Sequence, residues 1–458
     1  MFKAVKRTLA IFLVLAMALT AVGCGDNGNT DVQGSGNGTS DGKINFADVT
    51  LDSDALLASM PAELKGTKLV FLNWYNPDDR EEKDVIAAFE QKSGIDVEYK
   101  VLDHNTYATS VAQMIQVGEQ GDVMRLKNPN IGQYKLLQPL SATEFDYSGK
   151  EWDQYVMGLY TVGDKAYATN LKYTPFFVPG MQFYNSQTFE DMGFEDPWTL
   201  WQEGKWTWSK MKEMCNTWVT ENGTEYTGAS CWSYPSTVAG ASFFKLNEDG
   251  VTYSMDLNNT AALACWQFIG EGRALGLFGT YLHEGFDQMK QKMLIDHCDA
   301  TAVQNSSEYF KKTKLMGKLK AVPAPVWDGE GATGEYYVPM HEVCAYGVPK
   351  SAKNAKAVPY FLGYMCNFAN YNQDAGEGGF FVTEQIKEAY MDLLAREKRN
   401  YTINSDIANY TKSEEIGNFE WQIFNRVDPT QINSWLQERE YIINDSLTQY
   451  NAERVKYK

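Results

Sequence analysis

The stretch KLVFLNWYNPDD at residues 68–79 decides the fold. It begins with a continuous apolar run over 69–72, and this length suits a strand that is buried on both faces. The remainder is rich in Asn, Pro and Asp, which predicts a loop. We therefore expect a buried strand that ends in a loop. This loop carries the first binding candidates, Trp74, Tyr75 and Asn76.

Two further strands follow, with a helix before each. Asp78 and Asp79 are candidate N-caps for a helix that ends at Gly94. Apolar and charged residues alternate over 95–101, which predicts a strand, and a second helix ending at Gly118 leads to a third strand at 122–124. This order implies a parallel sheet covered on both faces. Ligands bind beyond the carboxyl ends of such strands, so Arg125, directly after the third strand, becomes a candidate.

The pattern begins again near residue 181. We expect a strand over 181–184, a helix over 186–192 and an aromatic loop over 197–208, and then helices that include 261–274 and much of the last third. Three tryptophans fall on the apolar stripes of these helices, which is typical of core positions: Trp208, Trp218 and Trp266. The sequence therefore predicts an α/β fold with two regions of this kind.

The N-terminus has the features of an export signal. Three basic residues precede an apolar run over 9–22, which is shorter than the about 20 residues of a membrane-spanning helix. We expect a signal peptide over 1–23. The sequence AVGC at 21–24 resembles the bacterial lipobox, in which the cysteine, here Cys24, is lipidated. An ordinary signal peptide with a chance cysteine is the alternative. The linker that follows to residue 45 is mostly too polar to fold.

Charge and cysteine usage exclude several classes of partner. The formal net charge is −18, which argues against nucleic acid or an anionic membrane face as a ligand. The six cysteines other than Cys24 are widely spaced and include no Cys-x-x-Cys pair. We therefore expect buried free thiols, rather than disulfides or a zinc site, and no cofactor.

Several short motifs, taken in order, resemble the large extracellular solute-binding proteins (family 1), which include maltose-binding protein. They are KLVFL at 68–72, FEQKSGIDV at 89–97, FYN at 183–185, FEDMGFEDP at 189–197, GKWTW at 204–208 and VPKSAKNAKA at 348–357. The resemblance covers roughly residues 66–370. The stretch 204–208 is similar to oligosaccharide-binding lipoproteins of Gram-positive bacteria.

This resemblance implies a two-lobed fold of the periplasmic-binding-protein type, in which each lobe is a mainly parallel sheet flanked by helices. The ligand binds between the lobes, and a hinge joins them. Lobe one would comprise 66–178 and 298–342, and lobe two would comprise 182–294 and 346–458. It also implies delivery of the solute to the permease subunits of an ABC importer, and a monomer at the outer face of the cytoplasmic membrane of a Gram-positive bacterium.

A carbohydrate site needs aromatic rings for the C–H faces and polar groups for the hydroxyls. Aromatic residues make up 14% of the chain, which suits an oligosaccharide ligand. The resemblance places Trp232 or Tyr234 as a stacking aromatic in lobe two, and places Asp299 and His341 beside the crossing segments. Burial in the core is the alternative for the aromatic residues and for His341, and a surface ion pair is the alternative for Arg125.

An enzyme is the less favoured interpretation. Paired carboxylates hydrolyse glycosides, but a sequence does not show a pair across a cleft. The sequence lacks His-Glu-x-x-His and a phosphate loop ending in Gly-Lys-Ser/Thr. We therefore expect a lipid-anchored carbohydrate receptor that breaks no bond. A surface adhesin or a glycoside hydrolase lipoprotein remains the alternative.

Overall fold

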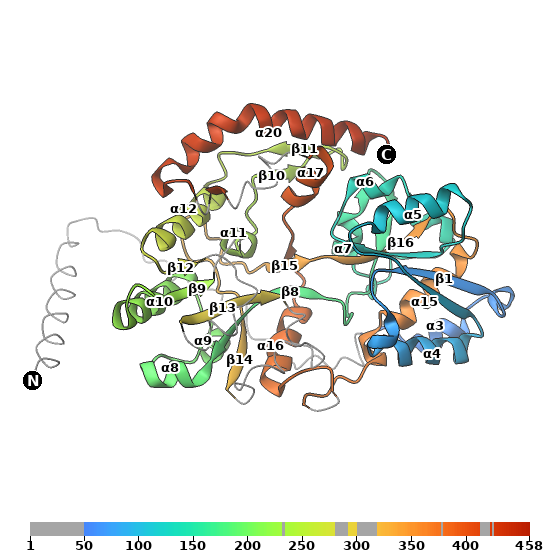
Figure 1. Ribbon diagram of the computed structural model, residues 1–458, viewed down its shortest axis with the longest axis horizontal. Helices are drawn as coiled ribbons and strands as arrows, with labels where there is room; N and C mark the ends of the chain where they lie inside the picture. Colours follow the sequence, from blue (N-terminus) through green and yellow to red (C-terminus); the bar gives the residue numbers. More distant parts are fainter. Residues whose placement is uncertain are drawn as a thin grey trace, which may run out of the picture. The chain divides into compact units, whose positions relative to one another are not determined.

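The computed structural model describes residues 50–230, 234–279, 292–299, 318–376, 379–412, 422–423 and 426–458. The stretch at 68–79 forms the predicted strand and loop (Figure 1). β1 (Lys68–Asn73) is buried beyond its first residue and lies between β2 (Asp96–Val101) and β3 (Val123–Lys127), parallel to both. Helix α4 (Glu82–Ser93) ends at Gly94, whose left-handed φ of 71° favours glycine. The predicted strand–helix order is therefore confirmed.

Two local predictions were wrong near this sheet. Residues Pro77–Asp79 form a 3-10 helix capped by Asn76, whose Oδ1 accepts from the Asp78 amide at 3.2 Å, and α4 starts only at Glu82. Neither Asp78 nor Asp79 caps α4, because the proline begins a separate turn. β3 continues to Lys127, so Arg125 lies inside the strand rather than after it.

The first sheet also contains strands from later in the chain, which make it mixed rather than purely parallel. β16 (Cys344–Pro349) pairs antiparallel with β3, opposite Arg125 and Lys127. This pairing extends β3 beyond the length that its own apolar run predicts. The full order is β2, β1, β3, β16 and β4 (Leu137–Gln138), with β7 (Ala168–Thr169) also paired to β16.

The second sheet is built around β8 (Val178–Asn185), which is antiparallel to three neighbours. Its order is β12 (Phe278–Gly279), β9 (Thr227–Ser230), β13 (Met293–Asp299), β8, β15 (Val338–Glu342) and β17 (Arg399–Asn400), with β14 (Leu319–Pro323) also paired to β8. In Figure 1, β8 and β15 lie side by side where the chain passes from one sheet to the other. The strand predicted at 181–184 therefore lies within β8.

Helices surround both sheets, and one of them occupies a predicted loop. Pro197–Gln202 forms α9, because Pro197 fits the first turn and Asp196 accepts from the Thr199 amide at 3.1 Å. The described helices are α3 (Ser53–Ala58), α4, α5 (Tyr107–Gln116), α6 (Ile131–Tyr134), α7 (Gln154–Leu159), α8 (Ser186–Met192), α9, α10 (Trp208–Asn222), α11 (Tyr234–Val238), α12 (Thr260–Ala274), α15 (Val358–Met365), α16 (Glu384–Ala395), α17 (Asn404–Thr411) and α20 (Ile432–Val455). Within the described ranges, no helix has the length and apolar character needed to cross a membrane.

Strand pairing divides the chain differently from the predicted lobe segments. β14 falls in the segment assigned to lobe one, yet it pairs with β8 of the second sheet. β16 and α15 belong with the first sheet, where Phe361 of α15 contacts Phe71 at 5.5 Å between ring centroids. Residues 318–342 thus lie with the second sheet. The predicted lobe boundaries came from the resemblance to the family, whereas the observed boundaries are set by pairing between strands that are distant in sequence.

The second passage between the sheets is fixed at Asn128. This residue follows β3 with a φ of 61°, a left-handed conformation that Asn adopts more readily than most residues. Its amide donates to the Val343 carbonyl at 2.8 Å, and its Oδ1 accepts from the Val343 amide at 2.8 Å. Asn128 therefore holds Val343, which lies between β15 and β16, at two points.

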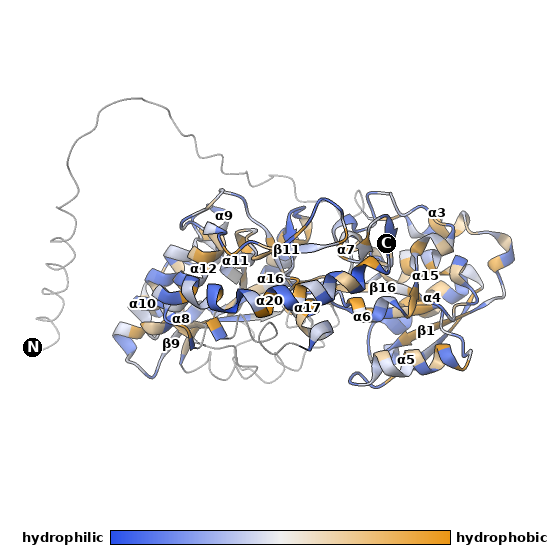
Figure 2. Cartoon of the chain, turned by 90° about the horizontal axis from the view of Figure 1, so that it is seen from above, coloured by the Kyte–Doolittle hydropathy of each residue, from blue (hydrophilic) through white to orange (hydrophobic). Residues whose placement is uncertain are grey.

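The C-terminal helix α20 joins segments that are distant in sequence, and it carries both hydrophobic and hydrophilic residues (Figure 2). Arg454 is buried and donates to the Val251 carbonyl at 2.5 Å and the Thr161 carbonyl at 3.0 Å. Those acceptors lie at two hairpins, β5–β6 (Thr161–Val162 and Lys165–Ala166) and β10–β11 (Phe244–Leu246 and Tyr253–Met255). Tyr450 donates to Asp406 of α17, which also accepts from the Ile131 amide.

The cysteines whose side chains are described are buried free thiols, as the sequence predicted. They are Cys215, Cys265, Cys344 and Cys366. Cys231 lies outside the described residues, and the side chain of Cys298 is not described.

Candidate functional site

The loop after β1 and the strand β3 bring three predicted site residues together. The Arg125 guanidinium carbon lies 5.3 Å from the Trp74 ring centroid and 4.6 Å from that of Tyr75. Phe176 and Tyr346 complete the surroundings at 4.8 and 5.9 Å. A guanidinium among aromatic faces is stabilised by their quadrupoles. Three of the predicted site residues thus lie together near the carboxyl ends of β1 and β3.

Arg125 is not part of a surface ion pair. Its side chain is only 11% exposed. Its Nη1 lies 3.6 Å from Oε1 of Glu82, and the Glu82 side chain is 5% exposed. Tyr75 joins the two, since Arg125 donates to the Tyr75 hydroxyl and that hydroxyl donates to Glu82. Buried charges require partners of this kind. The polar contacts of the Arg125 guanidinium are therefore made inside the protein rather than at its surface.

The environment of Glu82 favours its protonated form. Burial raises the pKa of Glu82 to about 8, while the Arg80 charge opposes this and the Glu81 charge adds to it. The Glu82 carboxyl still accepts from Tyr75, whatever its charge. Glu82 was missed by the sequence prediction, because it lies in the first turn of α4, where acidic residues are common.

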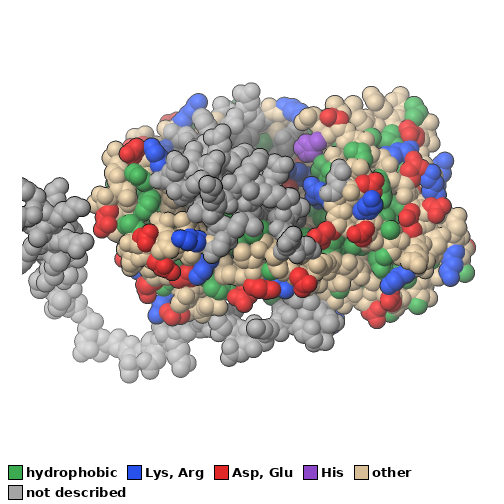
Figure 3. Space-filling model, turned by 60° about the horizontal axis from the view of Figure 1, so that its bottom comes forward, with side chains coloured by type: hydrophobic (Ala, Val, Ile, Leu, Met, Phe, Trp, Pro, Cys, Tyr) green, Lys and Arg blue, Asp and Glu red, His purple; other side chains and the backbone are tan. Residues whose placement is uncertain are grey.

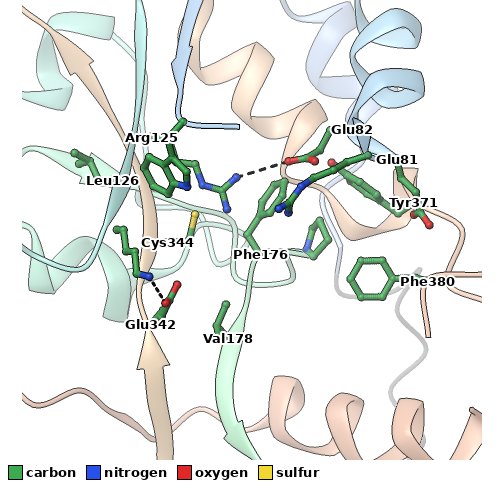
Figure 4. Close-up of a pocket in the computed structure, with 14 residues that line it drawn as sticks. Glu81, Glu82, Arg125, Leu126, Phe176, Val178, Glu342, Cys344, Tyr371 and Phe380 are labelled. Atoms are coloured by element: carbon green, nitrogen blue, oxygen red, sulfur yellow. Dashed lines mark ion pairs between the residues drawn. The ribbon is translucent and has the colours of Figure 1, made fainter. Parts of the chain in front are cut away.

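Trp74, Glu82 and Arg125 line a cavity of about 100 Å³, shown in Figure 4, whereas Tyr75 is not one of its lining residues. The lining combines aromatic rings with both signs of charge, and it comes from the loop after β1, the start of α4, β3, the residues that precede β8, and β15–β16. The lining residues are Trp74, Arg80, Glu81, Glu82, Arg125, Leu126, Lys127, Pro175, Phe176, Val178, Glu342, Cys344, Tyr371 and Phe380. Residues from both sheets therefore meet at one cavity.

Three features of this cavity suit a polar ligand with apolar faces. Trp74 is half-buried and its ring is fixed by edge contacts with Tyr107 and His104, at 5.2 and 5.6 Å between centroids. Lys127 and Glu342 form an ion pair in the lining, and both are partly exposed. In the described part of the chain, the buried Arg125 Nε has no hydrogen-bond partner. Buried donors are normally hydrogen-bonded, so we expect the Arg125 Nε–H group to donate to an acceptor in the cavity, either a water or a ligand oxygen.

Among the other predicted site residues whose side chains are described, Asn76 and His341 do not line the cavity. Asn76 caps the 3-10 helix, and His341 is half-buried in β15. Burial and the nearby His341 lower the pKa of His297. Asp299 ends β13 opposite Gly180 and Tyr234 begins α11, but neither side chain is described. Trp232 and Cys24 lie outside the described residues.

Several tryptophans occupy the core, as predicted. Trp208, Trp218 and Trp266 are all buried and line no part of the cavity.

The sequence prediction missed Phe176, which lies next to the start of β8, although an aromatic residue beside a predicted crossing segment was a usable signal. Figure 3 shows acidic and basic side chains interspersed over one face of the molecule, with a histidine near its middle. This face has no single sign of charge.

Solved structures with the same fold are sugar-binding proteins by their descriptions. The sugar-binding protein MalE from Xanthomonas citri has a TM-score of 0.59 at 11% identity, covering 85% of this chain and 98% of that one. The galacto-N-biose-/lacto-N-biose I-binding protein of the ABC transporter from Bifidobacterium longum, in complex with lacto-N-biose, has a TM-score of 0.56 at 16% identity, covering 84% and 97%.

A third, the ABC substrate-binding protein Lmo0181 from Listeria monocytogenes in complex with cycloalternan, has a TM-score of 0.53 at 15% identity, covering 84% and 98%. No curated protein sequence matches the chain at a significant level. At these identities the structures establish the fold, which is the two-lobed α/β fold that the sequence predicted.

The family itself is established by sequence. The profile described as bacterial extracellular solute-binding protein matches residues 75–367, which is more than half of the chain. This range includes β3, the passages from β7 to β8 and from β15 to β16, and all of the cavity lining except Trp74, Tyr371 and Phe380. The chain belongs to the bacterial extracellular solute-binding protein family.

Proposed function

We propose that this chain captures a carbohydrate between its lobes and delivers it to the permease of an ABC importer. A lipid on Cys24 would hold it at the outer face of the cytoplasmic membrane. The family supports solute binding, and the fold is shared with proteins described in complex with cycloalternan and lacto-N-biose. The cavity carries the proposal, since it combines aromatic rings and ion pairs at the carboxyl ends of β1 and β3.

The arrangement matches the chemistry of a sugar ring. The C–H face of the ring stacks on an aromatic side chain, and Trp74 offers a ring that Tyr107 and His104 hold in orientation. The hydroxyl rim needs donors and acceptors, and Lys127, Glu342 and the Arg125 Nε supply them. Because Lys127 and Glu342 are partly exposed, their ion pair contributes only about 0–1 kcal/mol, so hydroxyls can displace it at low cost.

The size of the cavity bears on how the ligand enters. At about 100 Å³ it is smaller than the roughly 300–1,000 Å³ of typical small-molecule sites. An oligosaccharide therefore requires the lobes to separate before binding. The cavity is lined from both sheets, so a ligand that touches both sides favours the closed arrangement by its differential contacts.

A thermal-shift screen over neutral and acidic oligosaccharides tests this proposal. A ligand at about 100 times its Kd stabilises the native state by about 2.7 kcal/mol, which gives a clear rise in Tm. Mass spectrometry of the sugar after incubation separates a receptor from a hydrolase. No shift with any sugar, or a cleaved product, would overturn the proposal.

The variant Trp74→Ala should lose the shift. Tyr441→Ala is the matched control, because Tyr441 is an aromatic residue on α20 that is 83% exposed and does not line the cavity.

A further inference from the structure

The cavity contains three cations, and two of them are already paired. Lys127 pairs with Glu342, and Arg125 pairs with Glu82 and Tyr75. Arg80 is the third, and it makes no ion pair with any described residue. Arg80 is therefore the cation of the lining that is available to a ligand, whereas Arg125 is engaged with Tyr75 and Glu82.

Arg80 is held in place without a counter-ion. Its guanidinium carbon lies 4.0 Å from the centroid of the Tyr75 ring. That ring is itself fixed by hydrogen bonds to Glu82 and Arg125. Stacking covers the face of a guanidinium and leaves the N–H groups at its edge available, and these match a carboxylate or a similar planar anion. The backbone also contributes, since the Arg80 amide donates to the Pro77 carbonyl at 3.0 Å and ends the 3-10 helix.

The acidic residues of the lining do not cancel this cation. Glu82 contributes little negative charge because its burial favours the protonated form, Glu342 is in an ion pair with Lys127, and Glu81 is the remaining carboxyl of the lining. Glu81 follows Arg80 in sequence but has no ion pair with it in the described structure, so it can accept from sugar hydroxyls. The chain as a whole is strongly acidic, but interactions between exposed charges are screened over about 8 Å at physiological salt. Local charges therefore decide which ligand enters.

We propose that Arg80 selects a carbohydrate that carries an anionic substituent, a carboxylate or a sulfate, beside the ring face that stacks on aromatic side chains. This inference rests on the proposed function, and it adds the chemical class of the ligand and the side chain that recognises it. Arg125 then acts as a positioning residue, because it fixes Tyr75, and Tyr75 in turn supports Arg80.

Isothermal titration with matched pairs of sugars tests the inference. Each pair contains a uronic acid oligosaccharide and its neutral reduced counterpart, and sulfated disaccharides form a separate arm. The purified chain should bind one anionic class at least about tenfold more tightly than the neutral sugar, as expected for one charge-assisted contact. Arg80→Gln should abolish that preference and leave neutral sugars within about threefold, and Arg80→Lys should restore part of it because it keeps the charge.

Lys83→Gln is the matched control, since Lys83 is an exposed cation on the adjoining turn that does not line the cavity. It should keep the full preference. Equal binding of neutral and anionic sugars, or an unchanged preference in Arg80→Gln, would overturn the role of Arg80 while leaving carbohydrate capture intact. If no sugar of either kind binds, the proposed function falls together with this inference.

Discussion

The buried carboxyl of Asp406 should make stability depend on pH. Asp406 is 2% exposed, accepts from the Ile131 amide at 3.1 Å and from the Tyr450 hydroxyl, and lies on α17. Burial raises its pKa from 3.8 to about 7, against the opposing effects of these hydrogen bonds and of the Arg454 charge. The folded state therefore binds a proton that the unfolded state has already lost between these two values.

The sign and the size follow from this difference. Because the folded pKa is the higher one, the contribution of Asp406 is fully present below pH 3.8 and is lost as pH rises to about 7. At about 1.36 kcal/mol per pKa unit, a shift of roughly three units corresponds to about 4 kcal/mol as an upper value. Asp406→Asn removes the titration and keeps an oxygen for the Ile131 amide. The variant should match the wild type near pH 4 and be more stable by about 2–4 kcal/mol at pH 7.5.

Urea unfolding of both proteins from pH 4 to pH 8 measures this difference. Asp428→Asn is the control, since the Thr430 side chain lowers the pKa of the exposed Asp428 carboxyl, so the small difference from the wild type should run in the opposite direction. A difference between wild type and Asp406→Asn that stays constant with pH would refute the reasoning. The reasoning would also be refuted if Asp406→Asn became less stable than the wild type at high pH.

Two other outcomes follow from the site, and a third follows from the N-terminal sequence. Trp74→Ala should weaken carbohydrate binding at least about tenfold by titration calorimetry, because a stacking aromatic contributes about 1 kcal/mol beyond the area that it buries, whereas Trp74→Phe should retain most of the affinity. Arg125→Met should lower the free energy of unfolding by about 1–3 kcal/mol in urea unfolding, since it removes the donor to the Tyr75 hydroxyl, which in turn donates to Glu82; an unchanged free energy of unfolding would contradict this contact. Cys24→Ala should move the protein from the membrane fraction to the medium, and retention of the variant in membranes would contradict lipid anchoring at this residue.

Local patterns were sufficient to predict the first half of the first sheet. The apolar run of β1, the alternation in β2 and the Gly94 stop are all short-range signals, and each is found where it was expected. The same signals placed Trp74 and Tyr75 at a strand end. Arg125 was found for a partly wrong reason, because it lies within β3 and its guanidinium is engaged with Tyr75 and Glu82.

The rest of the site depends on contacts that no local pattern contains. β16 pairs with β3 although more than 200 residues separate them in the chain, and it brings Cys344 to the cavity. Glu342 arrives from β15, whose antiparallel pairing with β8 also sets the position of Val178. The strand pairing of residues 319–342 contradicts their assignment to lobe one for the same reason. Pairing between distant strands leaves no periodicity in the sequence of either strand.

The two-point contact between Asn128 and Val343 has a mechanical consequence. Any swing of β15 relative to the first sheet must turn about a residue whose amide and carbonyl are both fastened. Glu342 is adjacent to Val343, so such a rotation displaces it little, whereas atoms farther along the second sheet are displaced more. A small rotation at one peptide is therefore sufficient to change the width of the entrance between the lobes by a large amount.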